Sequence, residues 1–412
     1  MEIEILGSGQ EVGKSGILIK EGKSSVVLDY GPKIFPLPPT YPAACKPNAA
    51  IITHAHLDHS GAAPMLLRNR SIPLFMTDVT LDLSLMLIRD SLKIAQQEQY
   101  PIPFGNREIR KMVRCASPMK RGVPFQADVF RCKFYDAGHI PGSVGVLIQG
   151  GKKIFYTGDV QTEHSRLLSG CTIPEPVDTL IIESTYGTKF HTNRRQEEKR
   201  FLDAVEETLA NGGNAIIPVF AVGRAQELLM VLERYAKKIA IDGMVRTATE
   251  IILDYPRSIR EHKKLASIVQ KTHIVKRGAE RKDIYKKYPI ILSSAGMLTG
   301  GPIRYYAAEA SGHTKNKILF TGYLVEETAG KKLMETKKLE HLEEIMHVHC
   351  DVQQFDFSAH ADQRGLFDII RKTKPKQVVC VHGDACDRFA DVIRKELGVH
   401  AYAPTNGERI RV

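Results

Sequence analysis

Short runs of apolar residues, each ended by glycine or by polar residues, divide the first part of the chain. Glu2–Leu6 alternates between polar and apolar positions, which predicts a strand. Ile17–Lys20 and Ser25–Asp29 continue the series, and Asn48–Ile52 is a short apolar run of the kind found in a buried strand. The glycine-rich stretch between the first two runs lacks the spacing of a phosphate-binding loop, so we expect a hairpin turn there, with Lys14 as a loop cation.

Longer segments with apolar residues at helical spacing lie between such runs. Val79–Gln97 and Asn193–Leu209 are amphipathic over several turns and predict helices. Further helices are expected at Ala62–Arg70, Arg107–Val113, Arg260–Val269 and Asp387–Leu397. Further strands are expected at Phe130–Asp136, Val144–Gln149, Lys153–Tyr156, Leu180–Glu183, Asn214–Val219, Ile251–Asp254, Ile290–Ser293, Ile318–Gly322 and Gln377–Val381, with one more in Ala401–Val412. Strands and helices alternate in the middle of the chain, which predicts a parallel sheet covered by helices.

Length and composition narrow the class of protein. A chain of 412 residues is longer than one ordinary domain, so we expect two domains. A content of 43% hydrophobic and 25% charged residues is typical of a soluble globular protein, and no apolar run approaches the roughly 18–20 residues of a membrane span. The net charge of +11 favours a polyanionic partner but is weak support by itself. Seven scattered cysteines without a CxxC pair, and no apolar leader, favour the cytoplasm.

The sequence THAHLDHS at Thr53–Ser60 gathers metal-ligand residues directly after a predicted apolar strand. His54 and His56 alternate and can face the same way, and Asp58 and His59 follow one turn of loop later. Neutral imidazole and carboxylate are the groups that zinc and similar cations bind. A histidine pair alone is commonly a surface or core feature, but four such residues in the pattern HxHxDH predict a metal site.

Further candidates lie far downstream, most of them where a predicted strand ends. They are His139, Asp159, Glu183, His360 and His382. Each of them alone would be an ordinary loop or core residue. Their significance therefore depends on their order along the chain.

The order of these motifs resembles that of a known superfamily. HxHxDH followed by an isolated His and an isolated Asp resembles the metallo-β-lactamase signature. The motif ESTYG at Glu183–Gly187, a long insertion, and then SAHAD and VHGD resemble the β-CASP family, in particular its compact archaeal and bacterial members. That family includes RNase J and the nuclease subunit of the cleavage and polyadenylation specificity factor. The resemblance covers nearly the whole chain, with one departure at Asp384, where many members have Glu.

This resemblance implies a fold and a domain organisation. The expected fold class is α/β, a metallo-β-lactamase αββα sandwich with an inserted β-CASP domain whose sheet is mostly parallel. We expect the sandwich to comprise residues 1–189 and 347–412, and the inserted domain to comprise residues 190–346.

The resemblance also implies two zinc ions (Zn2+) per chain. His54, His56 and His139 would bind the first ion, Asp58, His59 and His382 the second, and Asp159 would bridge them. Asp29 would orient the ligand loop without touching a metal, although it could instead cap a turn. The two ions would share a hydroxide that attacks the phosphodiester.

Two further residues are implied as catalytic. His360 would donate a proton to the leaving 3′ oxygen, and Glu183 would hydrogen-bond its imidazole and keep it charged. The alternative for His360 is a buried histidine with its hydrogen bonds satisfied. Asp58 is expected to act in catalysis as well as in metal binding.

The implied function is that of a zinc-dependent ribonuclease that cuts single-stranded RNA endonucleolytically, in RNA processing or decay. His382 favours RNA, because the DNA-cutting branch of the family lacks His at this motif. Arg224, Ser293 and Ser294 follow predicted strands and are expected to contact RNA phosphates, unless they form plain turns. A 5′→3′ exoribonuclease stays open, whereas a metabolic metallo-hydrolase and a non-catalytic RNA-binding relative fit less well. A homodimer also stays open, and no membrane association is expected.

Overall fold

The computed structural model describes residues 1–174, 176–341 and 344–412, and the chain forms two compact units. The first unit comprises Met1–His164, Ser169–Phe190 and Ala359–Val412. The second comprises Ser165–Leu168 and His191–Ser358. Most of the second unit is therefore a single insertion into the first.

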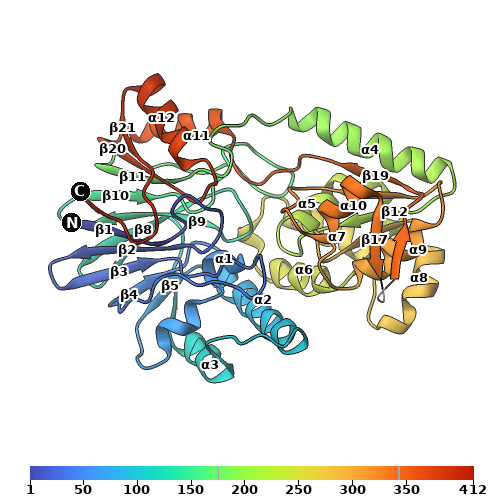
Figure 1. The fold of residues 1–412 in the computed structure, drawn as a ribbon, viewed down its shortest axis with the longest axis horizontal. Coiled ribbons are helices and arrows are strands. Elements are labelled where there is room, and N and C mark those ends of the chain that lie inside the picture. Colours follow the sequence, from blue (N-terminus) through green and yellow to red (C-terminus); the bar gives the residue numbers. More distant parts are fainter. Residues whose placement is uncertain (175, 342–343) are drawn as a thin grey trace. The chain divides into compact units, whose positions relative to one another are not determined.

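Two seven-stranded sheets form the centre of the first unit (Figure 1). Their strand orders are β22-β1-β2-β3-β4-β5-β6 and β21-β20-β11-β10-β9-β8-β7. The first sheet comprises β1 (Glu2–Gly7), β2 (Gly16–Glu21), β3 (Ser24–Leu28), β4 (Ala49–Ile51), β5 (Leu74–Met76), β6 (Ala116–Pro118) and β22 (Arg409–Arg411). The second comprises β7 (Pro124–Ala127), β8 (Phe130–Asp136), β9 (Val144–Gln149), β10 (Lys153–Tyr156), β11 (Thr179–Glu183), β20 (Gln377–Val381) and β21 (His400–Tyr402).

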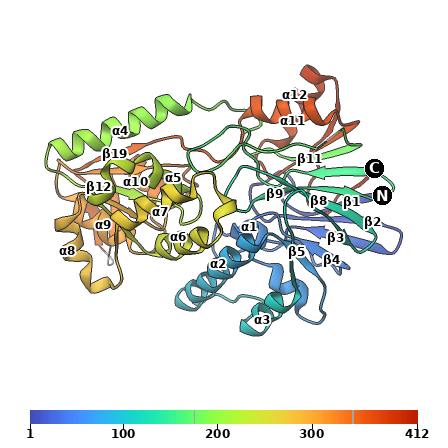
Figure 2. The same cartoon turned by 180° about the vertical axis from the view of Figure 1, so that it is seen from behind.

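Helices cover the outer face of each sheet, as Figures 1 and 2 show from opposite sides. The 3₁₀ helix η1 (Ala63–Leu67), α2 (Asp78–Gln97) and α3 (Asn106–Cys115) pack on the first sheet. The helices α11 (Gln363–Thr373) and α12 (Cys386–Leu397) pack on the second. The resulting order of layers is helix, sheet, sheet, helix, which confirms the expected αββα sandwich.

Alternation along the strands sets the two faces of the first sheet. Ile3 and Ile5 of β1 lie in the core shared with the second sheet, as do Val26 and Leu28 of β3. Val27 points the other way and packs under the helices. Both faces are apolar because both are covered. The expected hairpins are confirmed, since β1 pairs antiparallel with β2 and β9 with β10.

The second unit is built on a six-stranded sheet with the order β14-β13-β15-β12-β16-β19. Every pairing described in this sheet is parallel, which confirms the expectation from the sequence. Its strands are β12 (Ala215–Pro218), β13 (Ile239–Asp242), β14 (His273–Ile274), β15 (Ile290–Ser293), β16 (Lys317–Phe320) and β19 (Asp351–Gln354), and a separate hairpin pairs β17 (Lys338–His341) with β18 (Glu344–His347). Its helices are α4 (Arg194–Ala210), α5 (Arg224–Val231), η2 (Glu233–Lys238), α6 (Met244–Asp254), η3 (Pro256–Ser258), α7 (His262–Lys271), η4 (Gly278–Glu280), α8 (Arg281–Lys287), α9 (Ile303–Ser311) and α10 (Ala329–Thr336).

Some elements differ from those that the sequence predicted. The strand expected at Ile251–Asp254 is wrong, because these residues form the last turn of α6; a short apolar run cannot be told from a buried helix segment by periodicity. The single strand expected in Ala401–Val412 is two short strands in different sheets. The second unit also extends to Ser358, beyond residue 346, because β19 pairs with β16.

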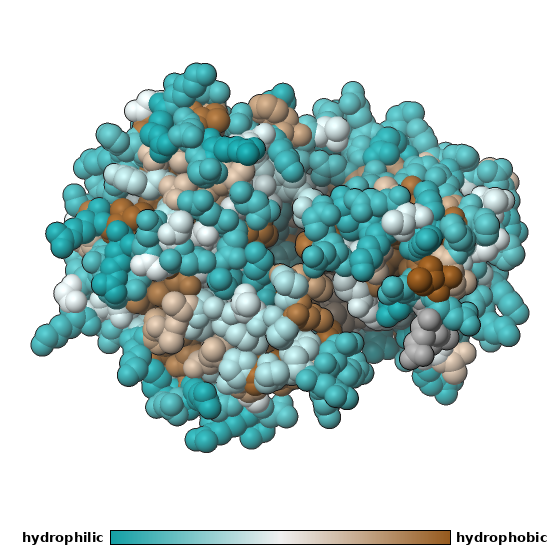
Figure 3. Space-filling view, in the orientation of Figure 1, coloured by the Kyte–Doolittle hydropathy of each residue, from teal (hydrophilic) through white to brown (hydrophobic). Residues whose placement is uncertain are grey.

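Polar side chains cover most of the face seen in Figure 3, and apolar residues appear there in small separate patches. In the described ranges of the chain, no helix combines the length and the apolar character needed to cross a membrane.

Candidate metal centre

The loop after β4 brings the first set of ligand-type side chains to the rim of the sandwich. The short helix α1 (Leu57–Ser60) follows β4 and carries Asp58 and His59. Gly31 allows this loop to pass close to the end of β3, because a Cβ at Gly31 would lie 2.1 Å from the carbonyl carbon of Asp58. Any larger residue at position 31 would therefore displace the loop.

Asp29, directly after β3, fixes this loop through both carboxylate oxygens. Oδ1 accepts from the N–H of Thr53 at 2.7 Å, and Oδ2 accepts from the Thr53 hydroxyl at 2.8 Å. Oδ2 also lies 2.8 Å from Nδ1 of His59 and accepts from the Tyr156 hydroxyl at 2.9 Å. The carboxylate is fully buried, and it holds both Thr53 of the loop and the ring of His59 in position.

The second sheet supplies the remaining side chains. Strands β10, β11 and β20 are parallel neighbours, and β8 runs in the same direction because both β8 and β10 are antiparallel to β9. Their carboxyl ends therefore reach one edge. His139, Asp159, Glu183 and His382 lie at or just beyond these four strand ends.

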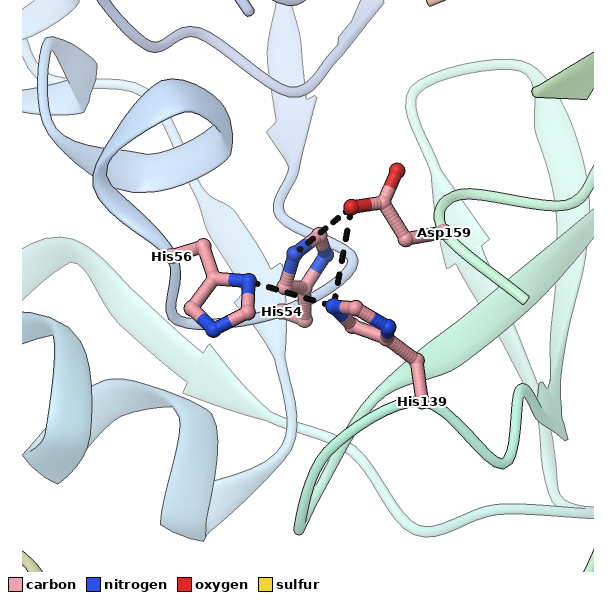
Figure 4. Close-up of side chains that lie close together, drawn as sticks. All are labelled: His54, His56, His139 and Asp159. Carbon is pink, nitrogen blue, oxygen red and sulfur yellow. Dashed lines mark hydrogen bonds and ion pairs between the residues drawn. The ribbon is translucent and has the colours of Figure 1, made fainter. Parts of the chain in front are cut away.

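His54, His56, His139 and Asp159 form one group, in which the ligand atoms lie within 4.8 Å of one another (Figure 4). Oδ2 of Asp159 is 3.5 Å from Nε2 of His54 and 3.6 Å from Nε2 of His139. Nδ1 of His56 is 3.1 Å from Nε2 of His139. The four side chains come from three loops and point toward a common centre.

Asp58, His59 and His382 form a second group with the same spacing. Nε2 of His382 lies 3.2 Å from Oδ2 of Asp58 and 3.3 Å from Nε2 of His59. Oδ1 of Asp159 lies 3.3 Å from Nε2 of His59. One oxygen of the Asp159 carboxylate thus faces each group.

Hydrogen bonds at the opposite ring nitrogen orient most of these imidazoles. Nδ1 of His54 lies 3.1 Å from the Thr53 hydroxyl, and Nδ1 of His139 lies 2.9 Å from the carbonyl oxygen of Ala359. Nδ1 of His382 lies 3.3 Å from the Thr185 hydroxyl. Such contacts leave Nε2 of each ring directed at the centre, as in histidines that bind metals.

Burial determines the charge state of the first group. It lowers the pKa of His54 and His139 well below the usual value and lowers the pKa of His56 to about 4. Burial opposes ionisation of Asp159, but the charges of His59 and His382 outweigh it and hold the pKa of Asp159 well below its usual range. The groups are therefore neutral imidazoles around an ionised carboxylate, which are the forms that bind divalent cations.

Two further observations fit a cation at this place. Among the residues that the structure describes, Nε2 of His54 is buried without a hydrogen-bond partner, an arrangement that is costly unless something else satisfies the atom. Burial opposes protonation of His59, but Asp159, Asp58 and Asp29 around it raise its pKa well above the usual value. The same concentration of negative charge favours a bound cation.

His360 and Glu183 lie beside the first group. Nδ1 of His360 is 2.8 Å from Oε1 and 3.1 Å from Oε2 of Glu183. The ring centroids of His360 and His139 are 4.6 Å apart. Burial opposes protonation of His360, but the charges of Glu183 and Asp159 outweigh it and raise its pKa to about 9. These two residues and Asp159 also form a third group with metal-ligand spacing.

The residues expected to contact phosphates lie in the second unit, at the carboxyl ends of its strands. Arg224 begins α5, and its Nη1 donates to the carbonyl oxygen of Thr321 at 2.8 Å. Ser293 is fully buried, and the hydroxyl of Ser294 accepts from the N–H of Met244 at 3.1 Å. The structure therefore does not bring the two serine hydroxyls to the surface.

The sequence alone did not identify Thr53, Tyr156 or Thr185, which orient ligand-type residues. Thr53 directly precedes His54, Tyr156 ends the predicted strand three residues before Asp159, and Thr185 lies within the ESTYG motif. Closeness in sequence to a predicted site residue was the only signal, and it cannot reveal a hydrogen bond across the rim.

An αββα sandwich with a histidine and aspartate cluster at its rim is the architecture of a metallo-hydrolase. Three family models match the chain. They are described as metallo-beta-lactamase superfamily over residues 15–201, Beta-Casp domain over residues 225–333, and Zn-dependent metallo-hydrolase RNA specificity domain over residues 345–404.

Relatives extend the match over the whole length. The chain is 36% identical to "Probable RNase MJ4" of Methanocaldococcus jannaschii, covering 100% of both chains. It is 33% identical to "RNase aCSPSF2" of Saccharolobus solfataricus, covering 99% of this chain and 85% of that protein. It is 32% identical to "Transcription termination factor FttA" of Methanocaldococcus jannaschii, covering 100% of this chain and 72% of that protein. The chain belongs to the metallo-β-lactamase β-CASP ribonuclease family.

A solved structure shows the same fold at low identity. It is a protein of unknown function from Enterococcus faecalis, with a TM-score of 0.65 and 14% identity, covering 100% of this chain and 99% of that chain. Membership of the family confirms the resemblance read from the motifs, supports a nuclease that hydrolyses its substrate and binds RNA, and implies a divalent metal.

Proposed function

We propose that this protein is a zinc-dependent ribonuclease that cuts single-stranded RNA internally, with two zinc ions at the rim of the sandwich. The observation that carries the proposal is the carboxylate of Asp159, whose two oxygens face two separate groups of ligand-type atoms. His54, His56 and His139 would hold one ion, Asp58, His59 and His382 the other, and Asp159 would bridge them. A bound zinc pair supplies a nucleophile at neutral pH and stabilises the attacking and leaving oxygens of a phosphoryl displacement.

The chain's own residues would orient the ligands and supply a proton. Asp29 holds the ligand loop and the ring of His59, so the ligand nitrogens are preorganised. His360 would give its proton to the leaving 3′ oxygen from Nε2, because Nδ1 is bound to Glu183. The raised pKa of His360 supports this role, since the ring keeps a proton near neutral pH.

RNA as the substrate is supported by the relatives named as RNases and by the RNA specificity domain that matches residues 345–404. Internal cutting and 5′→3′ exonucleolytic cutting could use the same metal site, and we propose internal cutting. A 5′→3′ exonuclease needs a pocket that captures a free 5′ phosphate with several converging donors. Because Ser293 is buried and Ser294 is hydrogen-bonded to Met244, Arg224 is the one residue of the expected trio that we retain as a phosphate contact.

A circular single-stranded RNA separates the two modes, because it has no end. The zinc-loaded protein should cut the circle at a rate close to that for a linear RNA of the same sequence, and should leave a matched DNA uncut. An inert circle beside a linear 5′-monophosphate RNA degraded to mononucleotides would overturn the internal mode. No cleavage of any RNA by protein that holds its zinc would overturn the proposed function itself.

A further inference from the structure

Two exposed aromatic rings stand at the carboxyl edge of the sheet in the second unit. Phe220 follows β12 and is 40% exposed, and Tyr323 follows β16 and is 51% exposed. The strands β12 and β16 are parallel neighbours, so their carboxyl ends lie side by side. Other large aromatic residues of this unit, such as Phe320 and Phe355, are fully buried. The exposure of Phe220 and Tyr323 is therefore a local feature of this edge.

Two glycines lie near one edge of the ring of Phe220. A Cβ at Gly296 would lie 3.3 Å from Cδ2 of Phe220, and a Cβ at Gly322 would lie 3.7 Å from Cε2. Gly296 belongs to the loop after β15, and Gly322 to the loop after β16. Because neither glycine has a side chain that could fold over the ring, the apolar surface stays accessible to a ligand.

Hydrogen bonds fix the loop that carries Tyr323. Arg224 donates to the carbonyl oxygen of Thr321 at 2.8 Å, and Nε2 of Gln354 donates to the carbonyl oxygen of Gly322 at 2.8 Å. The backbone that sets the position of the second ring is held from two sides. A loop whose backbone is fixed in this way loses little conformational entropy when a ligand stacks on its side chain.

The loop that carries Phe220 lies at a point of the sheet topology where open parallel sheets bind ligands. From β12 the chain proceeds to β13 and β14 on one side, and from β15 it crosses β12 to reach β16 on the other. Loops that leave neighbouring strands in opposite directions open a crevice beyond the carboxyl ends. Phe220 lies at this switch point, between the loops that follow β15 and β16.

We propose that Phe220 is a stacking platform for unpaired bases of the RNA substrate, with Tyr323 on the loop after the neighbouring strand as a second ring. The inference rests on the proposed ribonuclease function and adds a base-binding subsite to it. Every base has a π-face, so stacking on an aromatic ring tolerates any sequence, which suits an enzyme for single-stranded RNA. The guanidinium of Arg224, next to the same loop, supplies a cation for the adjoining phosphate.

Abasic RNA tests the platform directly. The binding partners are the full-length, zinc-loaded His360→Ala protein, which holds RNA without rapid cleavage, and oligoribonucleotides with one abasic nucleotide placed at successive positions. With Phe220 present, an abasic nucleotide at one or two positions should weaken binding about tenfold. Phe220→Ala should weaken binding of intact RNA by a similar factor and should add no further loss on the RNA that is abasic at those positions.

Two variants keep the test independent of folding. Phe220→Leu retains apolar bulk without a π-face and should behave like Phe220→Ala, whereas Phe220→Trp should bind as the parent does. Val129→Ala is the control, because Val129 is a 52% exposed apolar residue between β7 and β8 of the first unit and lies outside residues 345–404. Its affinity for intact RNA should not change.

Equal affinity of the Phe220→Ala and parent proteins for intact RNA would overturn the platform. The same loss on intact and on abasic RNA would also overturn it, since Phe220 would then act on the fold and not on a base. A change in oligomeric state without a change in RNA affinity would assign the patch to a protein partner. Failure of the parent to bind RNA at all would instead contradict the proposed function.

Discussion

Parallel strands end both at the rim of the first unit, which carries the candidate metal ligands, and at the carboxyl edge of the sheet in the second unit. The two places differ in that the side chains at the rim are buried and polar, whereas those at the edge include exposed aromatic rings. At the rim, His54, His59 and Asp159 are almost fully buried and are held by hydrogen bonds or close contacts with one another. At the other edge, Phe220 and Tyr323 are exposed beside glycine backbone.

The difference reflects what encloses each edge. In the sandwich, a second sheet and the HxHxDH loop enclose the rim, so charges there interact in a medium of low dielectric constant and fix one another. At the edge of the single sheet, the loops bury Ser293 and Ser294 but leave the rings of Phe220 and Tyr323 partly exposed and available for a ligand. We therefore expect substitutions at the rim to remove metal or chemistry, and substitutions at the edge to lower affinity and leave the chemistry intact.

The largest effect is expected for Asp159→Ala. Removing the carboxylate that faces both groups should lower the zinc content and abolish measurable RNA cleavage, which elemental analysis and a gel assay of one preparation would record. The matched control is Asp391→Ala on α12, an aspartate with a side chain that is 71% exposed. Asp159→Ala protein that holds two zinc ions and keeps full activity would contradict the bridging role of Asp159.

His360→Ala should keep the zinc and lose about 10²–10⁴-fold in cleavage rate, the usual contribution of a general acid. His400→Ala, an exposed histidine on β21, should change neither property. Loss of zinc on substitution of His360 would mean that it is a ligand, as its close approach to Asp159 and Glu183 allows.

Glu183→Gln should be milder, because it changes the partner of the acid and leaves the acid in place. The charge of Glu183 raises the pKa of His360, so the protonated ring persists until the pH rises through about 9. A neutral glutamine lowers that pKa, and the alkaline limb of the pH–rate profile should move to lower pH at unchanged zinc content. An alkaline limb at the same pH in both proteins would show that Glu183 does not raise the pKa of the proton donor.

The smallest effect is expected for Arg224→Ala, which should reduce the salt dependence of RNA binding by about one phosphate contact. Cleavage at saturating RNA should not change, since Arg224 lies in the second unit. Lys199→Ala on α4, with an 80% exposed side chain, provides the control. The same salt dependence of RNA binding for Arg224→Ala and wild-type protein would show that Arg224 does not contact an RNA phosphate.

The sequence predicted the rim better than it predicted the edge. The residues of the rim could be named because the order of their motifs resembles that of the metallo-β-lactamase and β-CASP families, whose expected sandwich brings the ends of distant strands to one rim. Ser293 and Ser294 follow a strand in the same way, but their position along the chain could not reveal that neighbouring loops bury them. Nor could it reveal that Gly296 and Gly322, from two different loops, both approach the ring of Phe220.

Zinc titration of the metal-stripped protein tests the central claim most directly. Zinc is added in steps to a known concentration of protein, and cleavage of a labelled single-stranded RNA is measured at each step. If Asp159 joins two metal positions, cleavage should stay low through the first equivalent, rise with the second and level off at two zinc ions per chain. Full cleavage at one equivalent, with no further rise at two, would contradict the two-metal account.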